Sequence, residues 1–242
     1  MDWKAECAAV IPCLNEATTI GPLVLSVREH LPRVFVVDDA SNDESARLAE
    51  DAGATVLHHG CVCGKGAALT TGWTKARQEG FTWALNLDGD GQHSAMDIPL
   101  FLERAEVGSA ALVIGNRMDS SSEMPLVRRH VNRWMSRQLS KLAGQPLPDS
   151  QCGFRLMNLN SWSQLTIKAT HFEIESEILL AFIAARERIT FVPIQVIYDG
   201  EVSKIHPVRD TIRWFHWRRQ AKRLLVPKRP QTAHGNQGCL RA

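Results

Sequence analysis

Residues 81–94 read "FTWALNLDGDGQHS": an apolar run followed by a polar segment with two aspartates, two glycines, a glutamine and a histidine. The apolar part predicts a buried strand, and the acidic part follows where that strand would end. Three interpretations are open for the acidic part: a solvated turn, a calcium loop, or a site for a metal ion bound to phosphate.

The rest of the chain alternates short apolar runs with helical patterns. Strands are predicted at residues 7–15, 34–41, 54–60, 81–91 and 111–118, with helices between them at 17–31, 43–53 and 64–80. A later helix is predicted at 170–189, with Thr170 and Glu173 as a capping box, followed by a strand at 191–200. Strands that alternate with helices of about 10–15 residues indicate βαβ units, and so an α/β fold with a mainly parallel central sheet flanked by helices.

Polar residues gather where the predicted strands end. They are Asn15, Glu16, Asp38, Asp39, Asp88, Asp90, Asn116 and Arg117. Sheets of this kind bind ligands at the carboxyl ends of their strands, so we expect these side chains to line one shared crevice.

The spacing within residues 88–99 disfavours calcium. An EF-hand loop needs glycine at position 6 and glutamate at position 12, where this chain has histidine and proline. Paired carboxylates suit Mg²⁺ or Mn²⁺, which complete their shells with phosphate oxygens and water. In an extended segment Asp88, Asp90 and Gln92 would point to the same side and could face one ion.

The segment "GCVCGKG" at residues 60–66 superficially resembles a phosphate-binding P-loop. Only three residues separate Gly60 from Gly64, and glycine rather than serine or threonine follows Lys65, so an ATPase or kinase is not favoured. We predict a turn that opens a helix, from which Lys65 could approach a phosphate.

Bulk composition excludes little. The chain has 242 residues, 44% of them hydrophobic and 22% charged, with a net charge of +2, as in ordinary globular proteins. No secretory signal pattern opens the sequence, and its longest apolar run, residues 178–185, is far too short to span a membrane. We therefore expect a cytoplasmic protein, either unattached or peripheral to the inner face of the membrane. The thiols should be reduced, and Cys61 and Cys63 do not match zinc-finger spacing.

Seven motifs occur in order along the chain: "VIPCLNE", "VVDDASND", "GKGAAL", "LDGDGQH", "GNR", "DSQCGFR" and "FEIESEIL". Together they resemble family 2 glycosyltransferases of the GT-A fold, and most closely the dolichyl-phosphate mannose synthase and polyprenyl-phosphate glycosyltransferase group. The resemblance covers roughly residues 8–215. It implies an inverting, metal-dependent transfer of a hexose from a GDP- or UDP-linked sugar to a polyprenyl phosphate or another membrane-associated acceptor.

The resemblance also implies roles for individual residues. Those at the nucleotide sugar would be Pro12, Asn15, Glu16, Asp39, Lys65, Asp88 and Gly89. Mg²⁺ or Mn²⁺ would lie on Asp88, Asp90 and Gln92. The acceptor phosphate would contact Arg117, Arg128, Arg129, Arg155 and Lys204. Catalysis would depend on Asp90, Arg117 and Asp149. Asp199 stands where some lipid-phosphate mannosyltransferases have arginine, which leaves the donor sugar and the acceptor unassigned.

The acceptor decides whether a general base is needed. A lipid phosphate has a second pKa near 6 and arrives already anionic, so it needs arginines for positioning. A hydroxyl of a lipid or small molecule would need a carboxylate base, for which Asp149 is the first candidate and Glu175 the second. Two other classes compete. A nucleotidyltransferase would want a glycine-rich basic loop after the first strand, where this chain has "PCLNEATTI". A non-catalytic nucleotide-sugar-binding protein would not need the paired aspartates.

Residues 209–225 combine basic and aromatic side chains. On a helical wheel one face carries Trp214, Trp217, Ala221, Leu224 and Leu225. This composition suits an interfacial helix on an anionic membrane, or a helix docked on the core with a solvated basic face. A nucleic-acid partner is not expected. The chain is thus predicted to divide into a GT-A domain at 1–208, a basic amphipathic helix at 209–227 and a disordered tail at 228–242.

Overall fold

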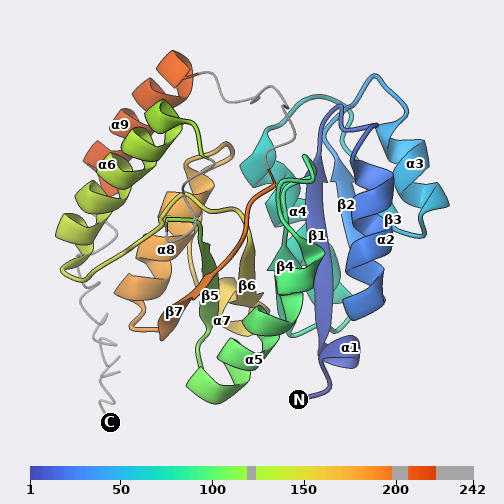
Figure 1. The fold of residues 1–242 in the computed structure, drawn as a ribbon, viewed down its shortest axis with the longest axis horizontal. Helices are drawn as coiled ribbons and strands as arrows, with labels where there is room; N and C mark the ends of the chain where they lie inside the picture. Colours follow the sequence, from blue (N-terminus) through green and yellow to red (C-terminus); the bar gives the residue numbers. More distant parts are fainter. Residues whose placement is uncertain (119–123, 198–206, 222–242) are drawn as a thin grey trace, which may run out of the picture.

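A computed structural model describes residues 1–118, 124–197 and 207–221 (Figure 1). The strands are β1 (Cys7–Cys13), β2 (Val34–Asp38), β3 (Thr55–His58), β4 (Trp83–Asn86), β5 (Leu112–Asn116), β6 (Arg155–Asn158) and β7 (Ile189–Pro193). The helices are α1 (Trp3–Glu6), α2 (Ile20–His30), α3 (Ser45–Asp51), α4 (Lys65–Gln78), the 3-10 helix η1 (Ala95–Asp97), α5 (Ile98–Gly108), α6 (Leu126–Ala143), α7 (Leu159–Ser163), α8 (Ile174–Ala184) and α9 (Pro207–Ala221).

The strands form one seven-stranded sheet in the order β3-β2-β1-β4-β6-β5-β7. Pairing is parallel except at β6, which runs antiparallel to both β4 and β5. The α/β class and the mainly parallel sheet are therefore confirmed, while β6 was not predicted. Strands β1, β2, β4 and β5 are almost wholly buried, as expected for a sheet covered by helices on both faces.

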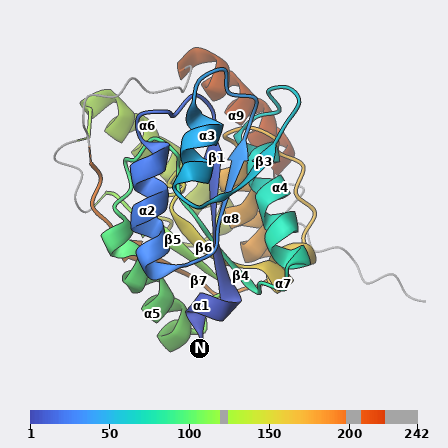
Figure 2. The same ribbon diagram turned by 90° about the vertical axis from the view of Figure 1, so that its right-hand side faces the viewer.

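Helices cover the sheet on two sides, with α2 and α5 on one face and α4, α7 and α8 on the other (Figure 2). Helix α4 lies very close to β1, since a Cβ atom at Gly72 would come within 2.4 Å of Val10 Cγ1. Its fully buried Trp73 donates a hydrogen bond from Nε1 to Asn86 Oδ1 of β4 (2.6 Å). These contacts hold the N-terminal end of α4 over the carboxyl ends of the central strands.

Helices α6 and α9 pack together beside this sandwich (Figure 1). The rings of Trp134 on α6 and Trp214 on α9 are 5.5 Å apart, and Arg218 donates to Gln138 (2.8 Å). Within the described residues, no helix combines the length and the apolar character that crossing a membrane requires.

Several predicted boundaries were wrong. Strand β4 ends at Asn86, because the polar segment after it turns, and β7 covers only Ile189–Pro193. The helix expected from residue 170 begins at Ile174. The hydroxyl of Thr170 contacts His171 Nδ1 instead of a helix N–H, so the predicted capping box is also wrong.

Candidate active site

Asp39 follows β2 and is the most deeply buried acidic residue near the carboxyl ends of β1 and β2. It is 3% exposed and accepts hydrogen bonds from the backbone N–H groups of Cys63 (2.9 Å) and Gly64 (2.7 Å). Its Oδ1 also lies 2.7 Å from Nδ1 of His59. Asp39 therefore ties the loop before α4 to the end of β2, and the sequence pattern assigned no role to His59.

The loop after β1 is held against the loop after β2. Asn15 has a left-handed backbone (φ 54°), and its side-chain Oδ1 accepts from the N–H of Asn42 (2.9 Å). The N–H of Glu16 donates to Ser45 Oγ (2.7 Å), and the N–H of Asp39 donates to the carbonyl of Cys13 (2.8 Å). The structure thus brings together Asn15, Glu16 and Asp39, three of the residues predicted for the nucleotide sugar.

Residues 88–91 form a turn, with Gly91 at φ +70°. Asp90 Oδ1 accepts from the N–H of Gln92 (3.1 Å), a local bond that an extended strand would not make. The expectation that the side chains of Asp88, Asp90 and Gln92 point to one side of an extended segment is therefore wrong. The backbone of Gly89 passes close to β1, where an added Cβ would lie 3.0 Å from the carbonyl oxygen of Pro12.

Asp88 is 27% exposed and faces Lys65, which is largely buried. Lys65 Nζ, in the first turn of α4, lies 2.6 Å from Asp88 Oδ1 and 2.5 Å from Glu175 Oε1 of α8. Burial alone would raise the pKa of Asp88, but the charge of Lys65 and a contact from His93 hold it well below its ordinary value. Burial would likewise lower the pKa of Lys65, and its two carboxylate partners raise it above its ordinary value. Glu175 is thus a buried partner of Lys65 and not a solvated helix residue.

The segment "CGFR" closes over Asp88. A Cβ atom at Gly153 would lie only 2.6 Å from Asp88 Oδ1, so this position tolerates no side chain without displacing the carboxylate. His93, which the sequence pattern left without a role, is 4% exposed and places Nε2 3.6 Å from Asp88 Oδ2. Its ring packs against Phe154 at 5.3 Å between centroids.

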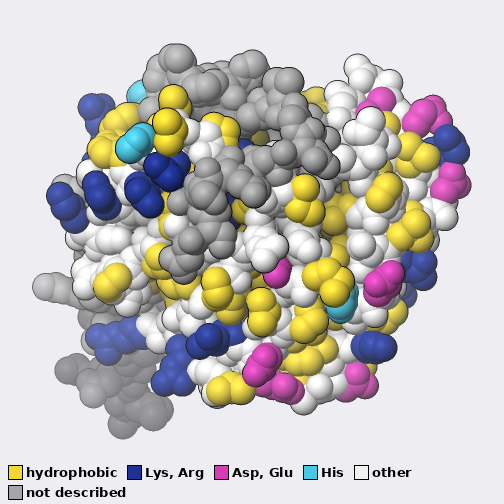
Figure 3. All heavy atoms as spheres, in the orientation of Figure 1, with side chains coloured by type: hydrophobic (Ala, Val, Ile, Leu, Met, Phe, Trp, Pro, Cys, Tyr) yellow, Lys and Arg dark blue, Asp and Glu magenta, His cyan; other side chains and the backbone are white. Residues whose placement is uncertain are grey.

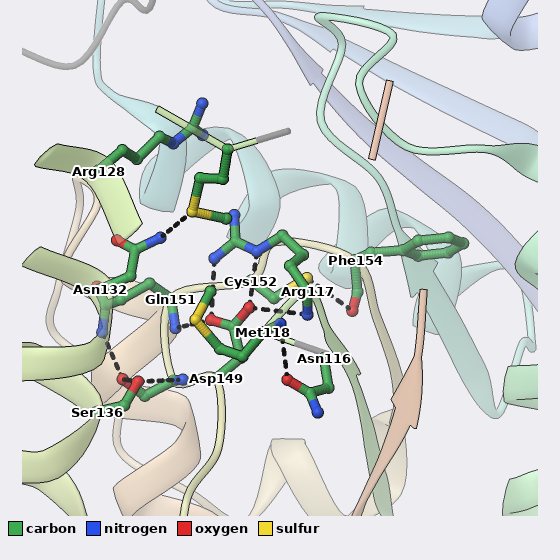
Figure 4. A network of polar contacts seen from close by, with 12 residues as sticks. Asn116, Arg117, Met118, Arg128, Asn132, Ser136, Asp149, Gln151, Cys152 and Phe154 are labelled. Carbon is green, nitrogen blue, oxygen red and sulfur yellow. Dashed lines mark hydrogen bonds and ion pairs between the residues drawn. The ribbon is translucent and has the colours of Figure 1, made fainter. Parts of the chain in front are cut away.

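Arg117 and Asp149 form a buried pair (Figure 4). Arg117 donates from Nε (2.7 Å) and Nη2 (2.9 Å) to the two carboxylate oxygens, and its backbone N–H adds a third bond (3.2 Å). The N–H of Gln151 is a further donor to Asp149 (3.1 Å). Burial alone would raise the pKa of Asp149, but the charge and donors of Arg117 lower it.

This pairing argues against two predicted roles. With no exposed surface, a lowered pKa and four donated bonds, Asp149 is poorly suited to take a proton from a hydroxyl acceptor. Arg117 is 5% exposed and has two of its donor nitrogens on Asp149, which leaves little of the guanidinium for an acceptor phosphate.

Arg155 is also a structural residue, contrary to its predicted contact with the acceptor phosphate. It is 2% exposed, and its three nitrogens donate to the backbone carbonyls of Cys152 (2.7 Å), Glu175 (2.6 Å) and Ser150 (3.0 Å). The side chain therefore joins the start of β6 to α8. Lys204 lies outside the described residues.

The N-terminal end of α6 carries the remaining predicted arginines. Arg128 Nη1 donates to Gln92 Oε1 (3.3 Å), which joins this helix to the turn that holds Asp88 and Asp90. Arg129 Nε is buried and has no hydrogen-bond partner in the described structure. The first turn of α6 contains no acidic residue. The first N–H groups of the helix, which have no partner within it, and the two arginines could therefore bind an anion.

Helix α9 turns its tryptophans inward. Trp214 is 2% exposed and donates to Ser176 Oγ of α8 (3.2 Å), and Trp217 donates to Glu177 (3.3 Å). For Trp214 and Trp217 the structure therefore shows the docked helix, while Leu224 and Leu225 of the same predicted face lie outside the described residues. The large apolar side chains that are exposed on α6 and α9 are Leu126, Val127, Val131, Trp134 and Phe215.

The mainly parallel sheet with an acidic turn at its carboxyl edge matches the GT-A fold of glycosyltransferases. The chain belongs to glycosyl transferase family 2, whose profile matches residues 8–165. The predicted family and the predicted enzyme class are therefore confirmed.

Named relatives support the same class. The chain is 32% identical over 204 residues to glycosyltransferase AglJ of Haloferax volcanii, covering 82% of this chain and 66% of that protein. It is 33% identical over 160 residues to an undecaprenyl-phosphate mannosyltransferase of Micrococcus luteus, covering 63% of this chain and 62% of that one. The chain thus spans just under two thirds of the length of each of these two relatives.

Solved structures share the fold. Glucosyl-3-phosphoglycerate synthase from Mycobacterium tuberculosis, crystallised with Mn²⁺, uridine diphosphate and phosphoglyceric acid, superposes with a TM-score of 0.70. The alignment covers 91% of this chain and 77% of that chain at 18% identity. Likeness at this identity shows the fold alone.

Proposed function

We propose that the chain transfers a hexose, with inversion, from a UDP- or GDP-linked sugar to a polyprenyl phosphate. The observation that carries this proposal is the position of the Asp88–Asp90 turn. On one side of this turn, near the carboxyl ends of β1 and β2, lie Asn15, Glu16 and Asp39. On the other side, Gln92 connects the turn to Arg128 of α6. A donor held on the first side would then present its sugar toward the N-terminal end of α6. The names of the polyprenyl-phosphate relatives support this acceptor class.

The turn has the ligand chemistry that Mg²⁺ or Mn²⁺ requires. Asp88, Asp90 and Gln92 offer hard oxygen donors, and Gly153 leaves room for the Asp88 carboxylate where any side chain would displace it. Asp90 is partly exposed and forms no ion pair with any of the described residues. A divalent ion held there would supply Lewis-acid stabilisation to the departing diphosphate.

The other residues bind and orient. Asp39 would accept from the nucleoside base, and the backbone at Gly89 allows the close approach of a nucleotide. Lys65 already holds Asp88 in place and carries a positive charge at the N-terminal end of α4, next to where a diphosphate would lie.

The acceptor phosphate would bind the first turn of α6 with Arg128 and Arg129. Because a phosphate monoester is anionic near neutral pH, its oxygen can attack without a protein base. This fits the burial of Asp149. The alternative with a hydroxyl acceptor would need that carboxylate to be accessible, and it is not.

Thermal unfolding in the presence of nucleotides tests the donor assignment. We expect the midpoint of the full chain to rise with either UDP or GDP and their sugars, and to rise further when Mn²⁺ is added. A ligand at 100 times its Kd adds about 2.7 kcal/mol to the free energy of unfolding. Asp90→Ala should lose the part of the midpoint increase that depends on Mn²⁺. Glu103→Gln, which replaces an exposed carboxylate on α5, should keep that part. A folded sample whose midpoint no nucleotide moves would contradict the proposal.

The acceptor side can be tested with two kinds of variant. Arg129→Gln should raise KM for a lipid phosphate at least about tenfold, because it removes a charged donor, and should leave nucleotide binding unchanged.

The exposed apolar residues of α6 lie among basic side chains (Figure 3), a composition that suits an anionic membrane. Val127→Ser with Val131→Ser should therefore raise KM only for acceptor in vesicles, and not for a short water-soluble polyprenyl phosphate. Equal effects of the two changes on both acceptors would overturn the separate roles.

A further inference from the structure

A second group of possible metal ligands lies in the loop before α4. A carboxylate oxygen of Asp39, a ring nitrogen of His59 and the sulfur of Cys63 all lie within 4.8 Å of one another. The sulfur of Cys61 is 3.9 Å from that of Cys63 but lies outside this group, so Cys61 would have to move to serve as a fourth ligand. Within residues 1–118, 124–197 and 207–221, Asp39, His59 and Cys63 form the only group of three His, Cys or acidic residues close enough to share an ion.

The backbone explains why these side chains meet. His59, Cys61 and Cys63 lie in the irregular segment that follows β3, where residues 60 and 61 form a bend and the two sulfurs come within 3.9 Å. Asp39 comes from the neighbouring strand, 24 residues before Cys63, and accepts the N–H of Cys63 and of Gly64. The sequence spacing typical of zinc fingers does not reveal this group, because Asp39 comes from a separate part of the chain.

The distances and ligand types suit a thiophilic ion. Two sulfurs bound to tetrahedral zinc at about 2.3 Å each lie about 3.8 Å apart, close to the observed 3.9 Å. Thiolate and imidazole ligands favour zinc and similar ions, whereas Mg²⁺ and Mn²⁺ favour the oxygen ligands of the Asp88–Asp90 turn. The ion would replace the hydrogen bond between His59 Nδ1 and Asp39 Oδ1.

We propose that Asp39, His59, Cys61 and Cys63 form a site for a thiophilic divalent ion, with zinc as the ion that fits best. This site is separate from the Asp88–Asp90 turn. Asp39 is shared with the nucleoside contacts of the proposed function, and on that function rests a consequence: zinc and the donor nucleotide compete. Zinc bound at the loop thus acts as an inhibitor of donor binding.

Cobalt serves as the spectroscopic probe of the site. The full chain, reduced with a phosphine and stripped of metal, should bind one Co²⁺ with a thiolate-to-cobalt charge-transfer band, and Zn²⁺ should displace it. Cys61→Ser and Cys63→Ser should each weaken binding at least about tenfold, since even the loss of an outer-shell partner costs 10–100-fold. Cys239→Ser is the matched control and should bind like the wild type. A missing thiolate band, or unchanged affinity in Cys63→Ser, would overturn the site.

Competition with nucleotide is measured separately. UDP or GDP, whichever raises the unfolding midpoint, should raise the Kd of the wild-type chain for free Zn²⁺, after correction for the Zn²⁺ that the diphosphate itself chelates. An unchanged Kd with bound nucleotide would overturn the shared use of Asp39. If no nucleotide binds at all, the proposed function and the competition fall together, and the cobalt titration still decides the metal site by itself.

Discussion

Replacing Asp90 by alanine is expected to lower kcat at least about 1000-fold while leaving the unfolding midpoint nearly unchanged. Removing one group that stabilises developing charge at an active site costs about 100- to 1000-fold, and loss of the metal charge on the diphosphate should cost more. The fold should survive because the Asp90 side chain is only partly buried and is bonded to a neighbouring N–H in its own turn. Steady-state rates with saturating donor and Mn²⁺ measure the effect.

Two further variants sharpen this prediction. Asp90→Asn keeps the shape and the local hydrogen bond but not the charge, and should be nearly as inactive as the alanine variant. Glu103→Gln removes an exposed carboxylate away from the sheet edge and should keep wild-type rates. Wild-type turnover by Asp90→Asn would rule out a charge-dependent role for this residue.

Breaking the Arg117–Asp149 pair should have the largest effect on stability. Asp149 has no exposed surface, so Arg117→Met would leave a buried carboxylate without its cation, a change that typically costs about 3–5 kcal/mol. Chemical denaturation of each single variant and of Arg117→Met with Asp149→Asn measures the coupling. We expect the double variant to lose less than the sum of the single losses, because neither partner is left as an unpaired charge.

The same pair predicts a dependence on pH. The lowered pKa of Asp149 means that its contribution to the free energy of unfolding is complete above the unfolded-state pKa of about 3.9. The contribution is lost as the pH falls through the lower folded-state pKa. Asp149→Asn should therefore reduce the loss of stability below about pH 4. It should not change the slope of the unfolding free energy against pH between pH 6 and 8. Arg33→Met, which breaks an exposed pair with Glu79, is the control and should change stability little.

The alternation of apolar runs and helical patterns was enough to predict the class of the fold. It could not reveal β6, because "RLMN" is short and its antiparallel place between β4 and β5 depends on partners far away in the sequence. The ends of the strands predicted where the acidic turn would lie. Its conformation depends instead on glycine and on a side chain bonding to its own backbone, which periodicity does not report.

Arginine roles were the weakest part of the prediction. Arg117, Arg128 and Arg155 look alike as basic residues, yet the first is paired with an acid, the second contacts Gln92 and the third binds three carbonyls. The difference arises from burial and from the groups that face each guanidinium. Similarly, Lys65 meets Glu175 across 110 residues of sequence, a contact that only the folded chain specifies.

The strand order has a consequence for how the protein is made. The half of the sheet formed by β3, β2, β1 and β4 is built entirely from residues 7–86, and α6, β6, α8 and α9 come later in the chain. Because the chain is synthesised from the N-terminus, these four strands leave the ribosome before α6, β6, α8 and α9 exist, and contacts such as Lys65 with Glu175 of α8 form only afterwards. Substitutions confined to α6 or α9 should then spare nucleotide binding and impair only the late steps of folding.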